Sequence, residues 1–269
     1  MEKFLLEKME STLVQSTPQY SLNGIKLNEF LGKNFSLSFS GILKCTACFK
    51  IVKKHYGGSF CYPCSIKLPE ADICILKPEL CHFAKGTCRD ENFGQTHCNQ
   101  KHFVYLSQTS GLKIGITRAT QIPTRWIDQG AIKGLAILKV STRFQSGRFE
   151  KLFNKEVLDK TDWRKMLKEG HEEIDLVEKK EELFFKLGNE LDELENEFNR
   201  GDIEFLDSNE ELIINYPVLL YPKKIQSINL LKVNEINSTL QGIKGQYLIF
   251  EDFVFNVRGH TGFEVNLNI

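Results

Sequence analysis

The sequence has no run of about 18 apolar residues, the length that a membrane-crossing helix requires. The first eight residues place glutamate and lysine inside a short apolar stretch, and no site resembling a leader-cleavage site follows. This pattern differs from that of a secretory signal peptide. We therefore expect no membrane association and a cytoplasmic location.

The sequence also has no glycine-rich phosphate loop of the Walker or dinucleotide-binding type, and no GxSxG turn. These absences argue against a P-loop nucleotidase, a Rossmann enzyme and a serine hydrolase with a nucleophile elbow. The chain has 269 residues, of which 41% are hydrophobic, so it can bury the core of one large domain or of two to three small ones.

The formal net charge is zero, because 35 basic side chains balance 35 acidic ones, but the charged residues are unevenly distributed along the chain. Residues 101–168 hold 14 Lys or Arg against 5 Asp or Glu, whereas residues 169–211 hold 4 against 17. The basic segment is either a phosphate-binding face or a solvated surface that packs against the acidic segment. The sequence alone leaves both interpretations open.

Cysteine is missing from most of the chain, since all eight cysteines lie between positions 45 and 98. Without a secretion signal, such clustering indicates metal binding rather than disulfides. Cys45 and Cys48 form one CxxC pair, and Cys61 and Cys64 form a second. Two such knuckles can complete a tetrahedron around one ion, so we predict a structural zinc site, with a redox dithiol or an iron–sulfur site as alternatives.

The other four cysteines have irregular spacing and predict a second structural zinc site less specifically. A nearby histidine could replace one thiol in this set. The candidate ligands are Cys74, Cys81, Cys88 and Cys98, with His82, His97 and His102 as the possible replacements.

Residues 101–168 predict a β-hairpin, a helix, a strand and a second helix in that order. Residues 102–107 and 112–117 are short apolar strands on either side of a Ser-Gly turn. Residues 123–130 begin with proline and end with glycine, as helices often do. A strand is expected at 136–140, followed by a helix that carries Arg148 and Glu150.

This order resembles the GIY-YIG endonuclease superfamily. Val104-Tyr105-Leu106 stands where the first tyrosine motif of that family stands, and Lys113-Ile114-Gly115 stands at the second, where the best-known members have tyrosine. The resemblance implies that Tyr105 activates or orients water, Arg125 stabilises the phosphate, and Glu150 holds Mg²⁺ or Mn²⁺. The implied candidate catalytic residues are Tyr105, Lys113, Arg125 and Glu150, and the candidate nucleic-acid contacts are Arg118, Arg148 and Lys165.

A second resemblance covers most of the chain. Residues 81–98, 111–130, 159–167 and 242–250 together look like an uncharacterised bacterial family, domain of unknown function 2797. That resemblance implies no established activity.

The remaining segments complete an α+β prediction. Apolar residues recur at helical spacing over 171–200 and predict one long amphipathic helix, which either packs on its own domain or binds a partner. Several short strands over 212–269 predict a small barrel or sheet, which the N-terminal strands are candidates to join. We divide the chain into an N-terminal strand segment at 1–44, a cysteine-rich region at 45–100, a nuclease-like domain at 101–168, an acidic amphipathic helix at 169–211 and a β-rich subdomain at 212–269.

Two functions agree with these features. The first is a zinc-stabilised endonuclease that hydrolyses phosphodiester bonds of DNA or RNA with the help of a divalent cation. The second is a non-catalytic nucleic-acid-binding or adaptor protein that keeps the fold without the activity.

Overall fold

The strands of this protein assemble into four sheets in the computed structural model, which describes residues 2–157, 162–170, 172–222 and 225–268. Helices pack beside these sheets, so the mixed α+β class is confirmed. No helix in the described ranges is long and apolar enough to cross a bilayer.

The largest sheet joins the two ends of the chain. Its strand order is β1-β17-β5-β13, and every pairing along that path is antiparallel. The strands are β1 (Glu2–Leu5), β5 (Asn34–Lys44), β13 (Glu235–Thr239) and β17 (Phe263–Asn268), with β6 (Ile51–Val52) paired to the far end of β5. The N-terminal strands therefore join the C-terminal ones, as their sequence suggested.

Two smaller sheets pack with this one around a shared apolar core, and we call the assembly the β-rich body. One contains β2 (Glu10–Val14), β3 (Thr17–Leu22) and β4 (Ile25–Lys26), followed by the 3-10 helix η1 (Leu27–Phe30). The other contains β12 (Ser227–Ile228), β14 (Gly242–Lys244), β15 (Tyr247–Ile249) and β16 (Val254–Asn256), with η7 (Arg258–His260) after it. The β15–β16 pairing confirms the hairpin that turns at residues 251–252.

The central sheet has β7 (His102–Gln108) between β8 (Leu112–Arg118) and β9 (Lys133–Val140). Between β8 and β9 come η6 (Ala119–Gln121) and α4 (Thr124–Asp128), and α5 (Arg143–Phe153) follows β9. The predicted order of hairpin, helix, strand and helix is confirmed. Thr142 begins α5 with a reciprocal capping box that includes Gln145.

The acidic segment contains two helices rather than the single helix predicted over residues 171–200, of which residue 171 lies outside the described part of the chain. α7 (Leu176–Lys186) ends at Leu187, whose φ of −104° and ψ of 12° depart from helical values, and α8 (Gly188–Glu195) begins directly afterwards. Glycine is a poor helix former, which favours a break at this point. The apolar face was predicted correctly, because the leucines of both helices are buried against the central sheet and α5.

Short strands and one short helix complete this region. β10 (Ile203–Phe205) and β11 (Leu212–Ile213) both pair with β9, so residues on either side of 207 belong to the central sheet. α6 (Trp163–Met166) begins at Asp162, whose carboxylate accepts two backbone N–H groups of its first turn.

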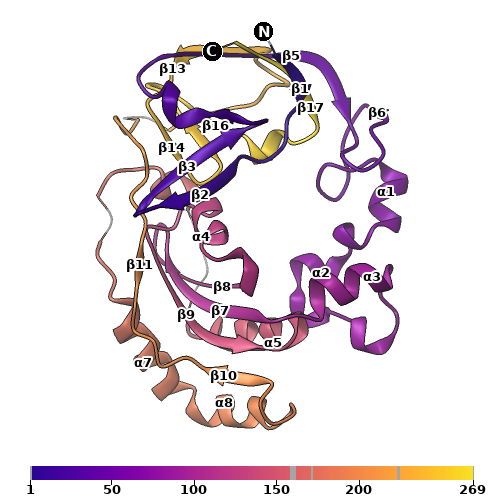
Figure 1. Cartoon of the computed structure of the whole chain (residues 1–269), viewed down its shortest axis with the longest axis vertical. Helices are drawn as coiled ribbons and strands as arrows, with labels where there is room; N and C mark the ends of the chain where they lie inside the picture. The colour runs from indigo at the N-terminus through magenta and orange to yellow at the C-terminus, as the bar shows by residue number, and fades with distance from the viewer. Residues whose placement is uncertain (1, 158–161, 171, 223–224, 269) are drawn as a thin grey trace.

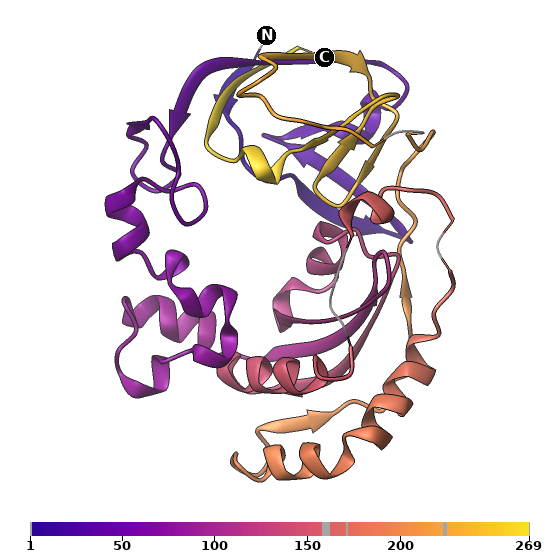
Figure 2. The same ribbon diagram turned by 180° about the vertical axis from the view of Figure 1, so that it is seen from behind.

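The cysteine-rich segment contains only short elements. They are α1 (Tyr62–Lys67), η2 (Pro69–Ala71), α2 (Ile73–Leu76), η3 (Pro78–Leu80), η4 (Phe83–Lys85), α3 (Glu91–Phe93) and the π-helix η5 (Gly94–Cys98). Figures 1 and 2 show this segment running along one side of the molecule, from the β-rich body to α2 and α3 beside α5. The helices α7 and α8 lie beyond the central sheet, at the end opposite the β-rich body.

Glu264 ties three strands of the largest sheet together. Its carboxylate lies 2.8 Å from Lys3 Nζ on β1 and 2.6 Å from Lys44 Nζ on β5, and it accepts a hydrogen bond from Ser40. The hydrogen bonds from Lys3 and Lys44 outweigh burial and lower the pKa of Glu264 to about 2.

We expect Glu264→Gln to lower the free energy of unfolding by about 1–2 kcal/mol at pH 7, because it leaves the half-buried amine of Lys44 and the exposed amine of Lys3 without their carboxylate. Since the folded-state pKa is depressed, this stabilisation is present above the unfolded pKa of about 4.3 and is lost as pH falls toward about 2. Urea unfolding at several pH values tests this. Glu235→Gln, on β13 of the same sheet, is the control, and an equal loss in both variants would contradict the prediction.

Candidate functional site

The first four thiols converge at one point. Cys45 follows β5, Cys48 lies in the turn after it, Cys61 caps α1, and Cys64 lies in its first turn. All four Sγ atoms lie within 4.8 Å of one another, and those of Cys48 and Cys61 are 3.7 Å apart. A tetrahedral zinc with Zn–S bonds of about 2.3 Å requires S–S separations of about 3.8 Å. The group is therefore able to bind a structural zinc ion.

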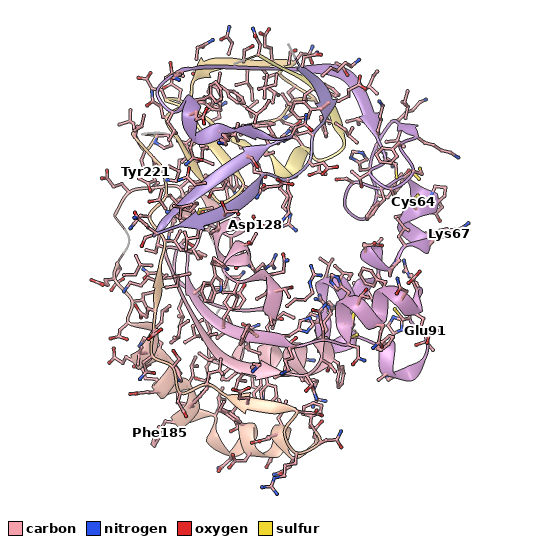
Figure 3. All side chains as sticks on the ribbon, in the orientation of Figure 1. Cys64, Lys67, Glu91, Asp128, Phe185 and Tyr221 are labelled. Carbon is pink, nitrogen blue, oxygen red and sulfur yellow. The ribbon has the colours of Figure 1, made fainter. Side chains whose placement is uncertain are left out.

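Local backbone structure prepares this group for a cation. Cys45 N–H donates to Lys50 O and Phe49 N–H donates to Cys45 O, closing a tight turn in which Phe49 has a positive φ of 58°. Burial disfavours the charged form of Cys45, but backbone N–H groups, including that of Cys48, lower its pKa to about 6. Thiolate is the form that binds metal. Figure 3 shows Cys64 among the sulfurs near the outer side of the cysteine-rich segment.

The other four cysteines line one small cavity together with Asp72 and His82. The interaction between Cys81 and Cys98 lowers the pKa of Cys81 to about 6 and raises the pKa of Cys98. Of the three candidate histidines, His82 lies at this cavity. His97 lines a different cleft, and His102 is buried on β7 with its Nδ1 2.7 Å from Gln100 O.

Charged side chains also gather in a cleft of about 450 Å³, which we call the central cleft. The central sheet and its helices supply most of its lining, the cysteine-rich segment one wall, and the β-rich body an edge. Its lining residues are Lys8, Ile75, Leu76, Pro78, His97, Lys113, Gly115, Ile116, Thr117, Arg118, Gln121, Arg125, Asp128, Gln129, Arg143, Glu150 and Arg258.

This cleft brings together three of the four candidate catalytic residues. Lys113 reaches it from β8, Arg125 from α4 and Glu150 from α5. Six cationic side chains line it against two carboxylates, so its potential is positive.

Tyr105, the fourth candidate, lies beneath the cleft and is fully buried. Its hydroxyl donates to Gln129 Oε1 at 2.8 Å, and its ring meets the Trp126 ring edge to face. Burial raises the pKa of Tyr105 to about 12, although the charge of Arg125 and a hydrogen bond from it act in the opposite direction. Tyr105 therefore carries its proton at neutral pH and connects Gln129 with Arg125.

The three candidate nucleic-acid contacts do not share one surface. Arg118 lines the central cleft, whereas Arg148 donates to Glu197 at 2.8 Å and Lys165 lies exposed on α6. Neither Arg148 nor Lys165 lines the cleft.

Several cleft residues were not predicted because they come from distant segments. Lys8 and Arg258 belong to the β-rich body, and Arg143 begins α5. Asp128 pairs with Lys8 at 2.8 Å and accepts from Gln246 at 2.9 Å, which fastens α4 to the β-rich body. In Figure 3 Asp128 lies at the junction with β2. Of these three residues, only Arg143 could have been found from the sequence, because it lies on the same helix as the candidate Glu150.

Fold and site together define an α+β protein with a four-cysteine group suited to a metal ion and, apart from it, a positively charged cleft. The model of the family described as "Protein of unknown function (DUF2797)" matches residues 32–265, and the chain belongs to this family. Comparison with curated proteins and with solved structures found no match. The resemblance to the GIY-YIG superfamily therefore stays a prediction.

Gly115 is required by the position of Tyr105, which faces it across the β7–β8 pairing. A Cβ at residue 115 would lie 2.5 Å from the Tyr105 hydroxyl oxygen. We expect Gly115→Ala to destabilise the protein by about 1–3 kcal/mol through overpacking. Gly111→Ala, in the turn of the same hairpin, has open space around it and should change stability by less than about 0.5 kcal/mol. Urea unfolding compares the two variants. Similar unfolding midpoints would show that the contact between Gly115 and Tyr105 does not constrain this site.

Loss of one thiol from the first group should release its metal. We expect Cys48→Ser to reduce the zinc content of the purified protein by about one ion per chain, because three thiolates bind zinc less tightly than four. Elemental analysis by mass spectrometry measures this after dialysis against a weak chelator. Unchanged zinc content in the variant would rule out this group as a zinc site.

Proposed function

We propose that this protein is a divalent-cation-dependent endonuclease of the cytoplasm that acts on the phosphodiester backbone of DNA or RNA. The observation that carries the proposal is the convergence of Lys113, Arg125 and Glu150 on one positively charged cleft. These residues come from three different elements, so proximity in sequence does not explain their meeting.

The residue types suit phosphoryl transfer. Negative charge builds on the oxygens of the transferred phosphoryl group, and fixed cations lower the energy of that transition state. The Arg125 guanidinium can bind two phosphate oxygens at once, whereas Lys113 supplies a compact single charge. Both charges are partly shielded from solvent, which strengthens their effect.

Glu150 is the proposed ligand of Mg²⁺ or Mn²⁺. A half-buried carboxylate beside an open cleft suits a hard cation that keeps several water molecules and binds substrate oxygens. Asp128, the other carboxylate of the cleft, instead joins α4 to the β-rich body through Lys8 and Gln246. When bound, the cation would supply charge neutralisation and an acidified water.

Tyr105 acts in this proposal as a positioning residue. Its pKa of about 12 disfavours a role as the resting general base at neutral pH. Its hydroxyl instead holds Gln129 at the cleft, and its hydrogen bond with Arg125 orients the guanidinium.

The same burial of Tyr105 favours a second candidate function, a nucleic-acid-binding protein or adaptor without cleavage. With Lys113 at the second motif and Tyr105 below the surface, no tyrosine among the described lining residues faces the cleft. The cationic lining would then serve binding alone.

We expect Glu150→Ala to abolish cleavage of a labelled DNA and RNA panel in Mg²⁺ or Mn²⁺ while binding stays nearly unchanged. The reason is that the variant loses the cation ligand but keeps every cationic side chain of the cleft. Glu156→Ala, just past α5 and exposed, is the matched control and should cleave as the wild type does. Retarded but intact nucleic acid with all three proteins would favour the binding function, and equal cleavage by Glu150→Ala would reject the metal role.

Substitution of two arginines tests whether nucleic acid binds in the central cleft or elsewhere on the basic surface. Arg118→Ala should weaken binding and reduce its dependence on salt between about 50 and 200 mM, because one phosphate contact is lost. Arg148→Ala removes the same charge outside the cleft and should have little effect. Equal effects of both changes would place the bound nucleic acid elsewhere.

A further inference from the structure

The small cavity lined by the last four cysteines has the size of one ion. Its volume is about 10 Å³, close to the space that a single water molecule requires. The residues that supply sulfur, nitrogen or carboxylate oxygen to it are Asp72, Cys74, Cys81, His82, Cys88 and Cys98. So many metal-binding side chains around so small an enclosed space are not expected from packing alone.

We propose that Cys74, Cys81, Cys98 and His82 bind a second zinc ion in this cavity. Cys81 and Cys98 interact with each other, and ligand atoms of Cys74 and His82 lie within 4.8 Å of each other and of Asp72. The lining of one small cavity brings these two pairs together. Three sulfurs and one imidazole nitrogen form a familiar structural zinc site.

His82 is the fourth ligand because its surroundings orient it as metal-bound histidines are oriented. Its Nδ1 lies 2.8 Å from Thr87 Oγ1, which leaves Nε2, 3.7 Å from Asp72 Oδ1, as the nitrogen that can serve a metal ion. Asp72 is excluded as a ligand because it is already engaged. Its carboxylate pairs with Arg89 at 2.7 Å and accepts the N–H of Cys74 at the start of α2.

Cys88 lines the cavity too, but it is more exposed than the other three cysteines there. It belongs neither to the group of Cys74, His82 and Asp72 nor to the Cys81–Cys98 pair. It therefore serves as a matched control for substitution of a cysteine at the same cavity.

The second ion would hold one wall of the central cleft. Ile75, Leu76 and Pro78 lie between two of its ligands in the sequence and line the cleft, as does His97 next to Cys98. Arg143 on α5 donates to Ile75 O at 2.8 Å, so the same wall is bound to the helix that carries Glu150.

Apart from its packing against α5, the segment from Ile73 to Cys98 has few other means of keeping this shape. Its longest described element is a π-helix of five residues, and Ile73, Leu76 and Leu80 are exposed rather than buried. Small regions without a sizeable apolar core commonly depend on metal ions or disulfides.

Metal analysis of the full-length protein, purified with zinc and dialysed, tests the proposal without reference to cleavage. We expect two zinc ions per chain in the wild type, one in Cys98→Ser, one in His82→Ala and two in Cys88→Ser. One zinc per chain in the wild type would overturn the proposal, whether or not any variant folds. If Cys88→Ser lost one zinc ion and His82→Ala kept both, the assignment of His82 as the fourth ligand would be overturned.

A structural readout tests the link to the cleft. Trypsin should cut after Lys85 at least several-fold faster in Cys98→Ser than in Cys88→Ser, because the wall loses its constraint. Equal rates, in proteins whose zinc contents differ, would show that the ion does not hold the wall.

Discussion

Close packing between α5 and the cysteine-rich segment is the constraint on which the central cleft depends. Gly147 of α5 lies directly against the backbone of Pro78 and Glu79, and any side chain at residue 147 would collide with it. Arg143, one turn earlier, donates to Ile75 O. These contacts place a loop-rich segment opposite β8 and α4, and the cleft is the space that remains between them.

The basic residues of the central module fall into two groups in the structure. Some basic residues of the central module pair with the acidic segment: Lys133 contacts Glu173 and Glu211, and Lys139 contacts Glu204. Others, such as Arg118 and Arg125, line the cleft instead. No described residue of 169–211 lines the cleft, so these carboxylates beside the helices neutralise part of the outer side and leave the inner side positive.

Local patterns in the sequence were sufficient to predict local structure. The order of strands and helices over 102–153 follows from turn residues and apolar runs, and the four-cysteine group follows from two CxxC pairs. The break at Leu187 was missed because the apolar period continues through it, and a period alone does not report where the backbone changes direction. The burial of Tyr105 depends on Gly115 across the pairing, a relation that a motif comparison does not reveal. Lys8 and Arg258 could not be predicted as cleft residues, since contacts between distant segments leave no periodic signal.

The pairing of β5 with β17 has a consequence for how the chain acquires its structure. β5 ends at Lys44, and its neighbours β13 and β17 begin only at Glu235 and Phe263, so this sheet cannot form until nearly the whole chain has been made. The central module, whose strands β7, β8 and β9 are close in sequence, closes much shorter loops and should form first. During synthesis, β1 and β5 must therefore wait with unpaired edges, which exposes them to aggregation before their partners arrive.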